Sequence, residues 1–334
     1  MIQISPETQL FIREHSSDDV RTLALQAKKY PDINMPTAIT QIAGRQVAAE
    51  KIPSWREIEE IWYPKHLSLE QCSSEITARY KARLLQGDSL TDLTGGFGID
   101  CSFLATGFKS ATYVERQQEL CEIAAHNFPI LNLNHINVKN EDGVSYLQAM
   151  SPVDCIFLDP ARRNEHGGKT VAISDCEPDV AELEELLLNK AGQVMVKLSP
   201  MLDLSLALKE LQHVQEVHII SANNECKELL LILGQASVEE ISIHCVNLPT
   251  KGIQEEQHFV FTREQEQCSE CNYTNVLENY LYEPNASLLK AGAFRSIASA
   301  FPVKKLHPNS HLYTSDVLVE SFPGRAFHII SQCS

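Results

Sequence analysis

The chain has 334 residues, which suggests two or three domains at about 100–200 residues each, and a formal net charge of −16. No basic segment followed by an apolar one opens the chain, and no uncharged stretch approaches the roughly 18 residues that cross a bilayer, which argues against a membrane protein. Its ten cysteines have no disulfide-framework spacing, so we expect reduced thiols and a cytoplasmic protein.

Residues 1–68 predict a helical N-terminal domain. Apolar residues recur there at helical spacing, in one group from Phe11 to Ala24 and in another from Ile39 to Ala48. Pro64 marks the expected boundary, and a further helix is expected to start near Ser73.

The central region, residues 69–236, opens with a strand, a glycine turn and a helix. Ser89–Thr94 is expected to form a buried strand, and Ile99–Ala105 the start of a helix. The turn between them is Gly-Gly-Phe-Gly, whose glycines can adopt positive φ and let a ligand lie against the backbone. This order is typical of a nucleoside-cofactor site. The cofactor-binding candidates here are Asp92, Thr94, Gly95, Gly96 and Gly98.

Three further apolar runs end in acidic residues. Ala111–Val114 leads to Glu115, His135–Val138 to Asp142, and Val153–Leu158 to Asp159. Open α/β sheets bind ligands at the carboxyl ends of their strands. Glu115 follows the first glycine by roughly 20 residues, the place of a ribose-binding carboxylate. Asp142 is the candidate for the adenine amino group, although a residue of this type also commonly begins a turn or helix.

Two cofactor classes fit such a region. A dinucleotide site requires Gly-x-Gly-x-x-Gly and a free helix N-terminus for the pyrophosphate. Asp100 at the helix start would repel a pyrophosphate, whereas Asp92 suits a cationic sulfonium ligand. S-adenosylmethionine therefore fits better than NAD.

The ordered set Asp92-Leu-Thr-Gly-Gly-Phe-Gly98, Glu115, Asp142 and Asp159-Pro-Ala-Arg162 resembles motifs I to IV of class I S-adenosylmethionine-dependent methyltransferases, over about residues 70–235. Three longer strings look like bacterial members with a C-terminal THUMP-like domain: Leu69-Glu-Gln-Cys-Ser-Ser-Glu75, Val196-Lys-Leu-Ser-Pro-Met-Leu-Asp203 and Tyr280-Leu-Tyr-Glu-Pro-Asn-Ala-Ser-Leu-Leu-Lys-Ala-Gly292. The resemblance implies an α/β fold with a doubly wound, seven-stranded class I methyltransferase sheet, and methyl transfer to RNA. Such proteins continue past the position of Ser334, so it also implies a truncated C-terminal module.

The rest of the central region alternates helices and strands, as a doubly wound sheet requires. We expect helices near residues 179–190 and 204–211, and a strand at 193–197. The apolar runs 217–220 and 228–233 are seven residues apart, too close for a helical crossover, so they should pair antiparallel. That hairpin is typical of class I methyltransferases and argues against a dinucleotide fold.

Two regions follow. Residues 237–275 hold extra strands and a linker, with a hairpin expected from the runs 241–246 and 258–261. The charged residues near 254–256 and 264–270 are expected to be solvated loop. Residues 276–334 are expected to form a small ferredoxin-like or THUMP-like α/β region.

The residues that follow the fourth expected strand bear on which molecule accepts the methyl group. Enzymes that methylate exocyclic base nitrogens commonly carry Asn/Asp-Pro-Pro-Tyr/Phe, whose aromatic ring stacks on an extruded base. Here Ala161 and Arg162 stand in the last two positions, and an arginine can stack on a base or bind phosphate instead. The catalytic candidates are Asp159, Pro160 and Arg162, and the substrate-binding candidates are Arg162, Arg163 and Lys197. Asp159 is also a cofactor-binding candidate.

RNA is the favoured acceptor, although the net charge suits phosphate binding poorly and leaves a small-molecule or protein acceptor open. A non-catalytic RNA- or protein-binding module that keeps the cofactor fold is a third reading. Two more basic clusters could steer an anion or be ordinary surface: Arg79, Lys81 and Arg83, and Lys304, Lys305 and His307.

No metal is expected. Cys268 and Cys271 have zinc-ligand spacing, but no second such pair follows. The twelve histidines form no familiar metal motif, so each is expected to be a core or surface residue. Cys155 lies inside an expected strand and should pack there. The sequence does not fix the oligomeric state.

Overall fold

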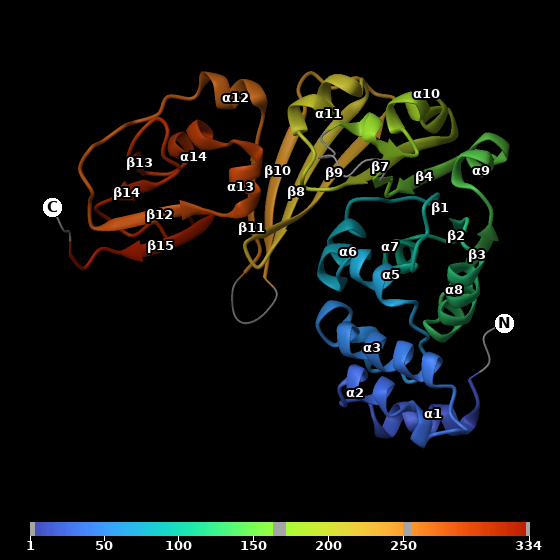
Figure 1. The fold of residues 1–334 in the computed structure, drawn as a ribbon. Helices are drawn as coiled ribbons and strands as arrows, with labels where there is room; N and C mark the ends of the chain where they lie inside the picture. Colours follow the sequence, from blue (N-terminus) through green and yellow to red (C-terminus); the bar gives the residue numbers. More distant parts are fainter. Residues whose placement is uncertain (1–3, 163–171, 250–254, 332–334) are drawn as a thin grey trace. The chain divides into compact units, whose positions relative to one another are not determined.

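The computed structural model describes residues 4–162, 172–249 and 255–331, which fall into two compact units (Figure 1). The first unit contains Met1–Leu158 and Asn189–Ala191, and the second contains Asp159–Leu188 and Gly192–Ser334. Among the described helices, none combines the length and apolar character that a membrane crossing requires.

The first unit begins with helices, as the apolar spacing predicts. Side chains of Ser5, Asp19 and Asn34 accept hydrogen bonds at the N-termini of three of them, which satisfies backbone N–H groups that lack helical partners. These helices are α1 (Pro6–Glu14), α2 (Val20–Leu25), η1 (Ala27–Lys29), α3 (Met35–Lys51), α4 (Pro53–Arg56), α5 (His66–Gln71) and α6 (Glu75–Lys81).

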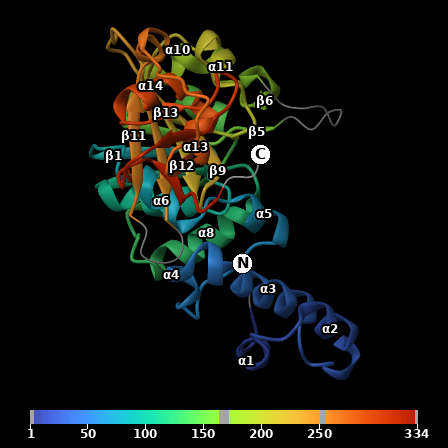
Figure 2. The same cartoon turned by 90° about the vertical axis from the view of Figure 1, so that its left-hand side faces the viewer.

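The N-terminal helices share a core with the helices that follow the first strands. Trp55 and Phe97 meet edge to face, with ring centroids 5.3 Å apart, inside a cluster that also buries Ile52, Ile99 and Ile123. In Figure 1, α6 and α7 lie between α3 and β1, and Figure 2 shows the same structure from the side. The glycine turn is therefore supported from behind by the N-terminal helices.

Four parallel strands of the first unit follow the order β3-β2-β1-β4. Leu90, Thr91 and Asp92 of β1 pair with both neighbouring strands, so β1 is central in this group. The elements are β1 (Ser89–Asp92), α7 (Ile99–Leu104), η2 (Ala105–Gly107), β2 (Ser110–Glu115), α8 (Gln118–Ile130), β3 (Ile136–Asn140), α9 (Gly143–Ala149) and β4 (Val153–Leu158). The expected strand, turn and helix order is confirmed.

The second unit carries the rest of the sheet in the order β7-β9-β8-β10-β11, and a separate C-terminal sheet in the order β13-β14-β12-β15. Its elements are β5 (Ala161–Arg162), η3 (Ile173–Asp175), β6 (Cys176–Glu177), α10 (Val180–Lys190), β7 (Ala191–Leu198), α11 (Leu204–Glu210), β8 (Val214–Ala222), β9 (Glu225–Gly234), β10 (Ser242–Leu248), β11 (Gln257–Phe261), α12 (Arg263–Cys268), β12 (Tyr280–Pro284), α13 (Ala286–Ala291), α14 (Phe294–Ala300), β13 (Lys304–Lys305), β14 (Tyr313–Ser315) and β15 (Gly324–His328). The last two residues of α10 and the first residue of β7 belong to the first unit.

Strands β8 and β9 form the antiparallel hairpin that the short spacing predicts. Asn223 and Asn224 turn the chain with φ of 51° and 61°, a left-handed conformation that asparagine tolerates and that suits a two-residue hairpin. Strand β9 also pairs antiparallel with β7. This is the class I methyltransferase strand order.

The seven expected strands are present in the order β3-β2-β1-β4-β7-β9-β8, and two more, β10 and β11, bring the main sheet to nine among the described residues. The hairpin expected from runs 241–246 and 258–261 does form, as β10 and β11. Strand β10 pairs parallel with β8, so this hairpin extends the sheet instead of standing apart from it. Pairing of β10 along seven residues satisfies the edge of β8 that would otherwise be open.

The charged segment near 264–270 is another correction, because α12 covers most of it. Thr262 and Gln265 form a reciprocal cap at the start of α12. Glu266 then accepts hydrogen bonds from the backbone N–H groups of Phe294, Arg295 and Ser296, at 2.8–3.0 Å. Its carboxylate satisfies the N-terminus of α14, so this charge has a structural role.

Candidate functional site

The end of β1 leads into a turn that requires glycine. Asp92 is buried, and its Oδ1 accepts a hydrogen bond from Thr94 N–H at 3.0 Å. Gly96 and Gly98 have φ of +54° and +87°, a region that residues with a side chain rarely adopt. A Cβ at Gly95 would come within 2.2 Å of the buried Tyr113 ring. The turn therefore lies against that ring, and Gly96 is its partly exposed glycine.

Glu115 ends β2 beside this turn. Its Oε2 accepts from Gly96 N–H at 2.9 Å, and its Oε1 accepts from Gln117 N–H at 2.7 Å. The residue is 8% exposed, so the carboxylate is held in one place. Each carboxylate oxygen can accept more than one hydrogen bond, so Glu115 can still receive two neighbouring hydroxyl groups. The predicted position of Glu115 at the strand end is confirmed, and its role stays a prediction.

Asp142 is exposed and begins α9. Its Oδ1 accepts from the backbone N–H of Ser145 at 2.9 Å and from the Ser145 hydroxyl at 3.1 Å. Gly143 lies against β1, because a Cβ there would meet the carbonyl oxygen of Leu93 at 2.2 Å. The helix-cap role of Asp142 is thus present, beside the turn, and the adenine role stays a prediction.

Sequence analysis missed two residues that organise this edge. Asn140 donates from Nδ2 to the carbonyl oxygens of Glu115 and Arg116, at 3.0 and 3.1 Å, and so fastens the ends of β2 and β3 together. Tyr113 donates from its hydroxyl to Gly96 O at 2.5 Å and fills the space behind the turn. The run Thr-Tyr-Val in an expected strand placed Tyr113 in the core but gave no sign of its contact with the turn.

Asp100 does not present a free negative charge at the start of α7. Lys81 Nζ lies 3.0 Å from Asp100 Oδ1, and the Lys81 side chain is fully buried. Ser73 donates to Asp100 Oδ2 at 2.7 Å and accepts from Lys81 at 2.9 Å. The expected repulsion of a pyrophosphate therefore loses its basis, and the strand order becomes the argument against a dinucleotide fold.

The two additional basic clusters are also corrected. Lys81 is buried in this ion pair, and Lys305 is 2% exposed and donates to the carbonyl oxygens of His307 and Pro308. Lys304 pairs with Glu278. These lysines are therefore engaged by the fold, and neither cluster forms a basic stripe.

Asp159, the residue that follows β4, is the first residue of the second unit. Asp159 Oδ2 is 2.5 Å from Lys197 Nζ; the Lys197 side chain is 10% exposed and that of Asp159 is 36% exposed. Pro160 is buried, and Ala161–Arg162 pairs with Cys176–Glu177 as β5 and β6. Arg163 lies outside the described residues. Lys197, expected to contact substrate, instead directs its ammonium to Asp159.

The paired ammonium changes what Asp159 can do. A carboxylate in contact with a buried ammonium is held in one orientation. Cys155, at the centre of β4, is 1% exposed, and burial raises the pKa of its thiol to about 11. Its expected packing role is confirmed.

Comparisons with known proteins agree with this architecture. Residues 280–323 match a family described as a ferredoxin-like domain. The chain is similar over 99% of its length to the crystal structure of a protein from Porphyromonas gingivalis W83 described as a candidate methyltransferase, with 36% identity, a TM-score of 0.85 and 84% of that chain covered. No curated protein matches the chain.

Two other solved structures share lower similarity. An rRNA methylase from Streptococcus thermophilus has 15% identity and a TM-score of 0.35, and covers 48% of this chain and 95% of its own. A methyltransferase-like protein from Streptococcus mutans in complex with SAH has 14% identity and a TM-score of 0.35, over 48% of this chain and 95% of its own.

Proposed function

The chain belongs to the same family as the Porphyromonas gingivalis W83 protein, and from this membership we propose that it is an S-adenosylmethionine-dependent methyltransferase. The observation that carries the proposal is the Glu115 carboxylate, fixed by Gly96 N–H beside a turn that only glycine allows. The residues present fit an adenosine-bearing ligand, since the turn offers bare backbone and Glu115 offers acceptors for two hydroxyls.

Each residue of the turn then has a distinct task. The turn at Gly95–Gly98 gives the ligand room against the main chain, and Asp92 holds that turn through Thr94 N–H. Glu115 accepts the ribose hydroxyls, and Asp142 accepts from the adenine amino group. The bound cofactor supplies an electrophilic methyl group on a positively charged sulfur.

The acceptor is oriented by the fourth strand end in this proposal. In-line methyl transfer releases a neutral thioether, so the protein mainly needs to align the acceptor with the methyl group. Asp159 accepts a hydrogen bond from the acceptor, and Lys197 holds the carboxylate in position. Pro160 limits the movement of the backbone, and Arg162 and Arg163 contact the substrate.

RNA is the proposed acceptor class. Support comes from the THUMP-like sequence resemblance and from the ferredoxin-like match at residues 280–323, both of which are arguments by analogy. A specific observation favours a small-molecule or protein acceptor as the second candidate: Lys81, Lys304 and Lys305 are engaged by the fold, so they add little to phosphate binding.

We place the protein in the cytoplasm, on the grounds that its nine described cysteines are all free.

The test measures cofactor binding and methyl transfer to the acceptor separately. Calorimetry with S-adenosylmethionine measures the first, and methyl transfer to total RNA from a deletion strain, read by mass spectrometry of nucleosides, measures the second. We expect binding together with one nucleoside restored. Binding without transfer to RNA would shift the assignment to the second candidate or to a non-catalytic module, and absence of binding would reject the methyltransferase.

Salt dependence tests the two arginines directly. Each phosphate neutralised on a single strand should contribute roughly 0.7 to the slope of log affinity against log salt, so changing Arg162 and Arg163 to Glu should abolish RNA binding and spare cofactor affinity. The matched control reverses Arg56, which is exposed on α4. An unaltered slope in the double variant would exclude phosphate contacts by this pair.

A further inference from the structure

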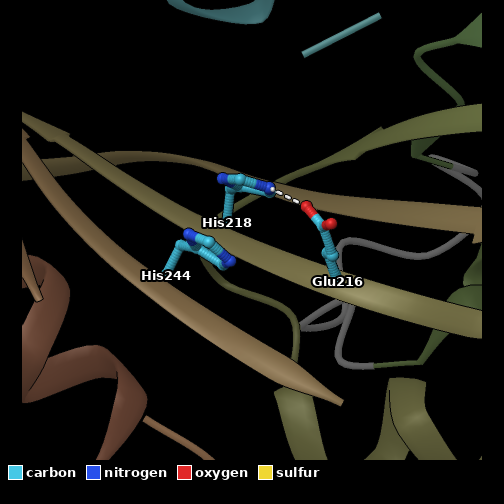
Figure 3. Close-up of side chains that lie close together, drawn as sticks. All are labelled: Glu216, His218 and His244. Carbon is cyan, nitrogen blue, oxygen red and sulfur yellow. Dashed lines mark hydrogen bonds and ion pairs between the residues drawn. The ribbon is translucent and has the colours of Figure 1, made fainter. Parts of the chain in front are cut away.

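A second group of chemistry-bearing side chains lies on the extended part of the sheet, in the second unit. His218 of β8 and His244 of β10 are directly paired residues on neighbouring parallel strands. Glu216 precedes His218 by two residues, so all three side chains project from the same face of the sheet. Figure 3 shows them directed toward one another. The sequence expectation that every histidine is a simple core or surface residue does not describe this arrangement.

The donor atoms are close enough to share one ion. His218 Nε2 lies 3.1 Å from Glu216 Oε2, and one donor atom from each of the three residues lies within 4.8 Å of the others. Two ligands of a tetrahedral zinc ion, each at about 2.0–2.1 Å, stand roughly 3.3 Å apart. The His218 and Glu216 donors already have this spacing. A rotamer change of His244 would bring its donor nitrogen to the same spacing from the other two donor atoms.

His258 of β11 fixes the ring of His244 from the other side. His244 Nδ1 and His258 Nε2 are 3.1 Å apart, within hydrogen-bond distance. A hydrogen bond to one ring nitrogen sets the tautomer and leaves the other nitrogen, Nε2, to face an ion. Metal-binding histidines almost always have such a partner on their second nitrogen.

A hydrogen-bonded cluster without a metal explains the arrangement of these three side chains less completely than a metal site does. The His218 and His244 rings stack with centroids 4.4 Å apart and an interplanar angle of 22°. His218 is only 2% exposed and lies between the carboxylate of Glu216 and the ring of His244. Two imidazole rings and one carboxylate gathered at one point are donors that a transition metal uses.

We propose that Glu216, His218 and His244 form a binding site for a divalent transition metal, with zinc favoured by the donor set. Two imidazoles and one carboxylate suit zinc, and three protein ligands leave a fourth position for water. The ion would join β10 to β8 and so fasten the strand that extends the sheet. This site does not depend on the methyltransferase proposal.

The test uses the full-length chain after treatment with a chelator. Titration with zinc chloride, followed by elemental analysis, should give one tightly held zinc per chain. Cobalt(II) in place of zinc should give the visible absorption of a tetrahedral centre without the strong near-ultraviolet band of thiolate ligands. His244→Ala should lower zinc affinity by more than about 100-fold, beyond the 10–100-fold loss typical of outer partners, and His258→Gln should fall within that range.

Two controls separate this site from others in the chain. His15→Ala removes a histidine that also pairs with a carboxylate, Asp18, at 2.6 Å but belongs to no three-ligand group among the described residues, and it should leave zinc affinity unchanged. The pair Cys268→Ser and Cys271→Ser removes the only Cys-x-x-Cys spacing in the sequence, and it too should leave affinity unchanged. Melting temperatures verify that each variant is folded.

Three outcomes would overturn the proposal: zinc affinity unaltered by His244→Ala, affinity lost with the two cysteines, or a wild-type chain that binds no zinc. If His244→Ala does not fold, His244→Gln and the cobalt spectrum of the wild-type chain give the same decision. A tetrahedral spectrum from nitrogen and oxygen ligands supports the site, and a thiolate spectrum rejects it.

Discussion

The two units hold their strand-end carboxylates in different ways. In the first unit, Asp92, Glu115 and Asp142 accept hydrogen bonds from backbone N–H groups. In the second, Asp159 is held by the buried ammonium of Lys197. A carboxylate bound by backbone is positioned by the fold itself, whereas one bound by a side chain depends on a single partner. The carboxylates of the first unit should therefore keep their positions when a neighbouring side chain is changed, whereas the position of Asp159 can be changed by one substitution.

The largest effect should follow from filling the glycine turn. In Gly95→Ala the new Cβ would stand 2.2 Å from the Tyr113 ring, which is fully buried and cannot move aside. Overpacking of this kind costs about 1–3 kcal/mol, and the displaced turn should abolish cofactor binding in calorimetry. Gly107→Ala is the matched control, because no atom lies within 4 Å of its added Cβ. Equal affinities for the two variants would mean that the turn is not part of the site.

Asp159→Ala should reduce turnover much more than stability. We expect a loss of about 100-fold in kcat, equivalent to about 2.7 kcal/mol in the barrier, with the melting temperature little changed. Asp159→Ala combined with Lys197→Met gives a double-mutant cycle, and the two effects on turnover should be far from additive because the side chains are in contact. A fall in melting temperature with normal turnover would show that the ion pair serves the fold alone.

Glu115→Ala should weaken the first unit's hold on the cofactor. Hydrogen bonds to a charged group contribute about 1.5–3 kcal/mol, so the dissociation constant for S-adenosylmethionine should rise by about 10–150-fold. Glu119→Ala is the control, because Glu119 is exposed, lies on α8 and pairs only with Lys65 among the contacts described for it. Unchanged affinity in folded Glu115→Ala would remove this residue from the site.

The smallest effect belongs to Asp142, where cap and ligand roles can be separated. Asp142→Ala loses the α9 cap and should destabilise the chain by about 1 kcal/mol in denaturant unfolding. Asp142→Ser keeps a capping oxygen but not the carboxylate. If Asp142 contacts adenine, both variants should bind the cofactor more weakly, by about 0.5–1.5 kcal/mol. Normal binding by the Ser variant would leave only the cap.

Local patterns predicted the first unit well. The alternation of apolar runs with Gly95–Gly98 and Glu115 depends on neighbours in sequence, and such patterns determine strands, turns and helices. The pairing of Lys81 with Asp100 could not be predicted, because a lysine in a helical segment normally reaches solvent and its partner is 19 positions away. The contact between Asp159 and Lys197 could not be predicted either, because the two residues are 38 positions apart in the sequence.

The second unit shows which signals were present but undervalued. Thr262 and Gln265 are spaced as a capping box, which marks a helix start even inside a charged run. The histidines of β8, β10 and β11 lie in three separate runs, and only strand pairing shows that they share a face. Sequence spacing therefore predicts a metal site only when its ligands lie on one element or one turn.

The β8–β9 turn has a consequence for how the second unit opens. Asn224 Oδ1 accepts from Ala286 N–H at 2.8 Å, at the start of α13, and Asn285 Nδ2 donates to Gln257 Oε1 at 3.0 Å. Gln257 Nε2 in turn donates to Gly324 O at 3.0 Å. These amide side chains connect the extended sheet to the C-terminal sheet, so the two should unfold together as one cooperative unit. The backbone hydrogen of Ala286 should then exchange with solvent only when that whole unit opens, at a rate that matches those of the central residues of β8.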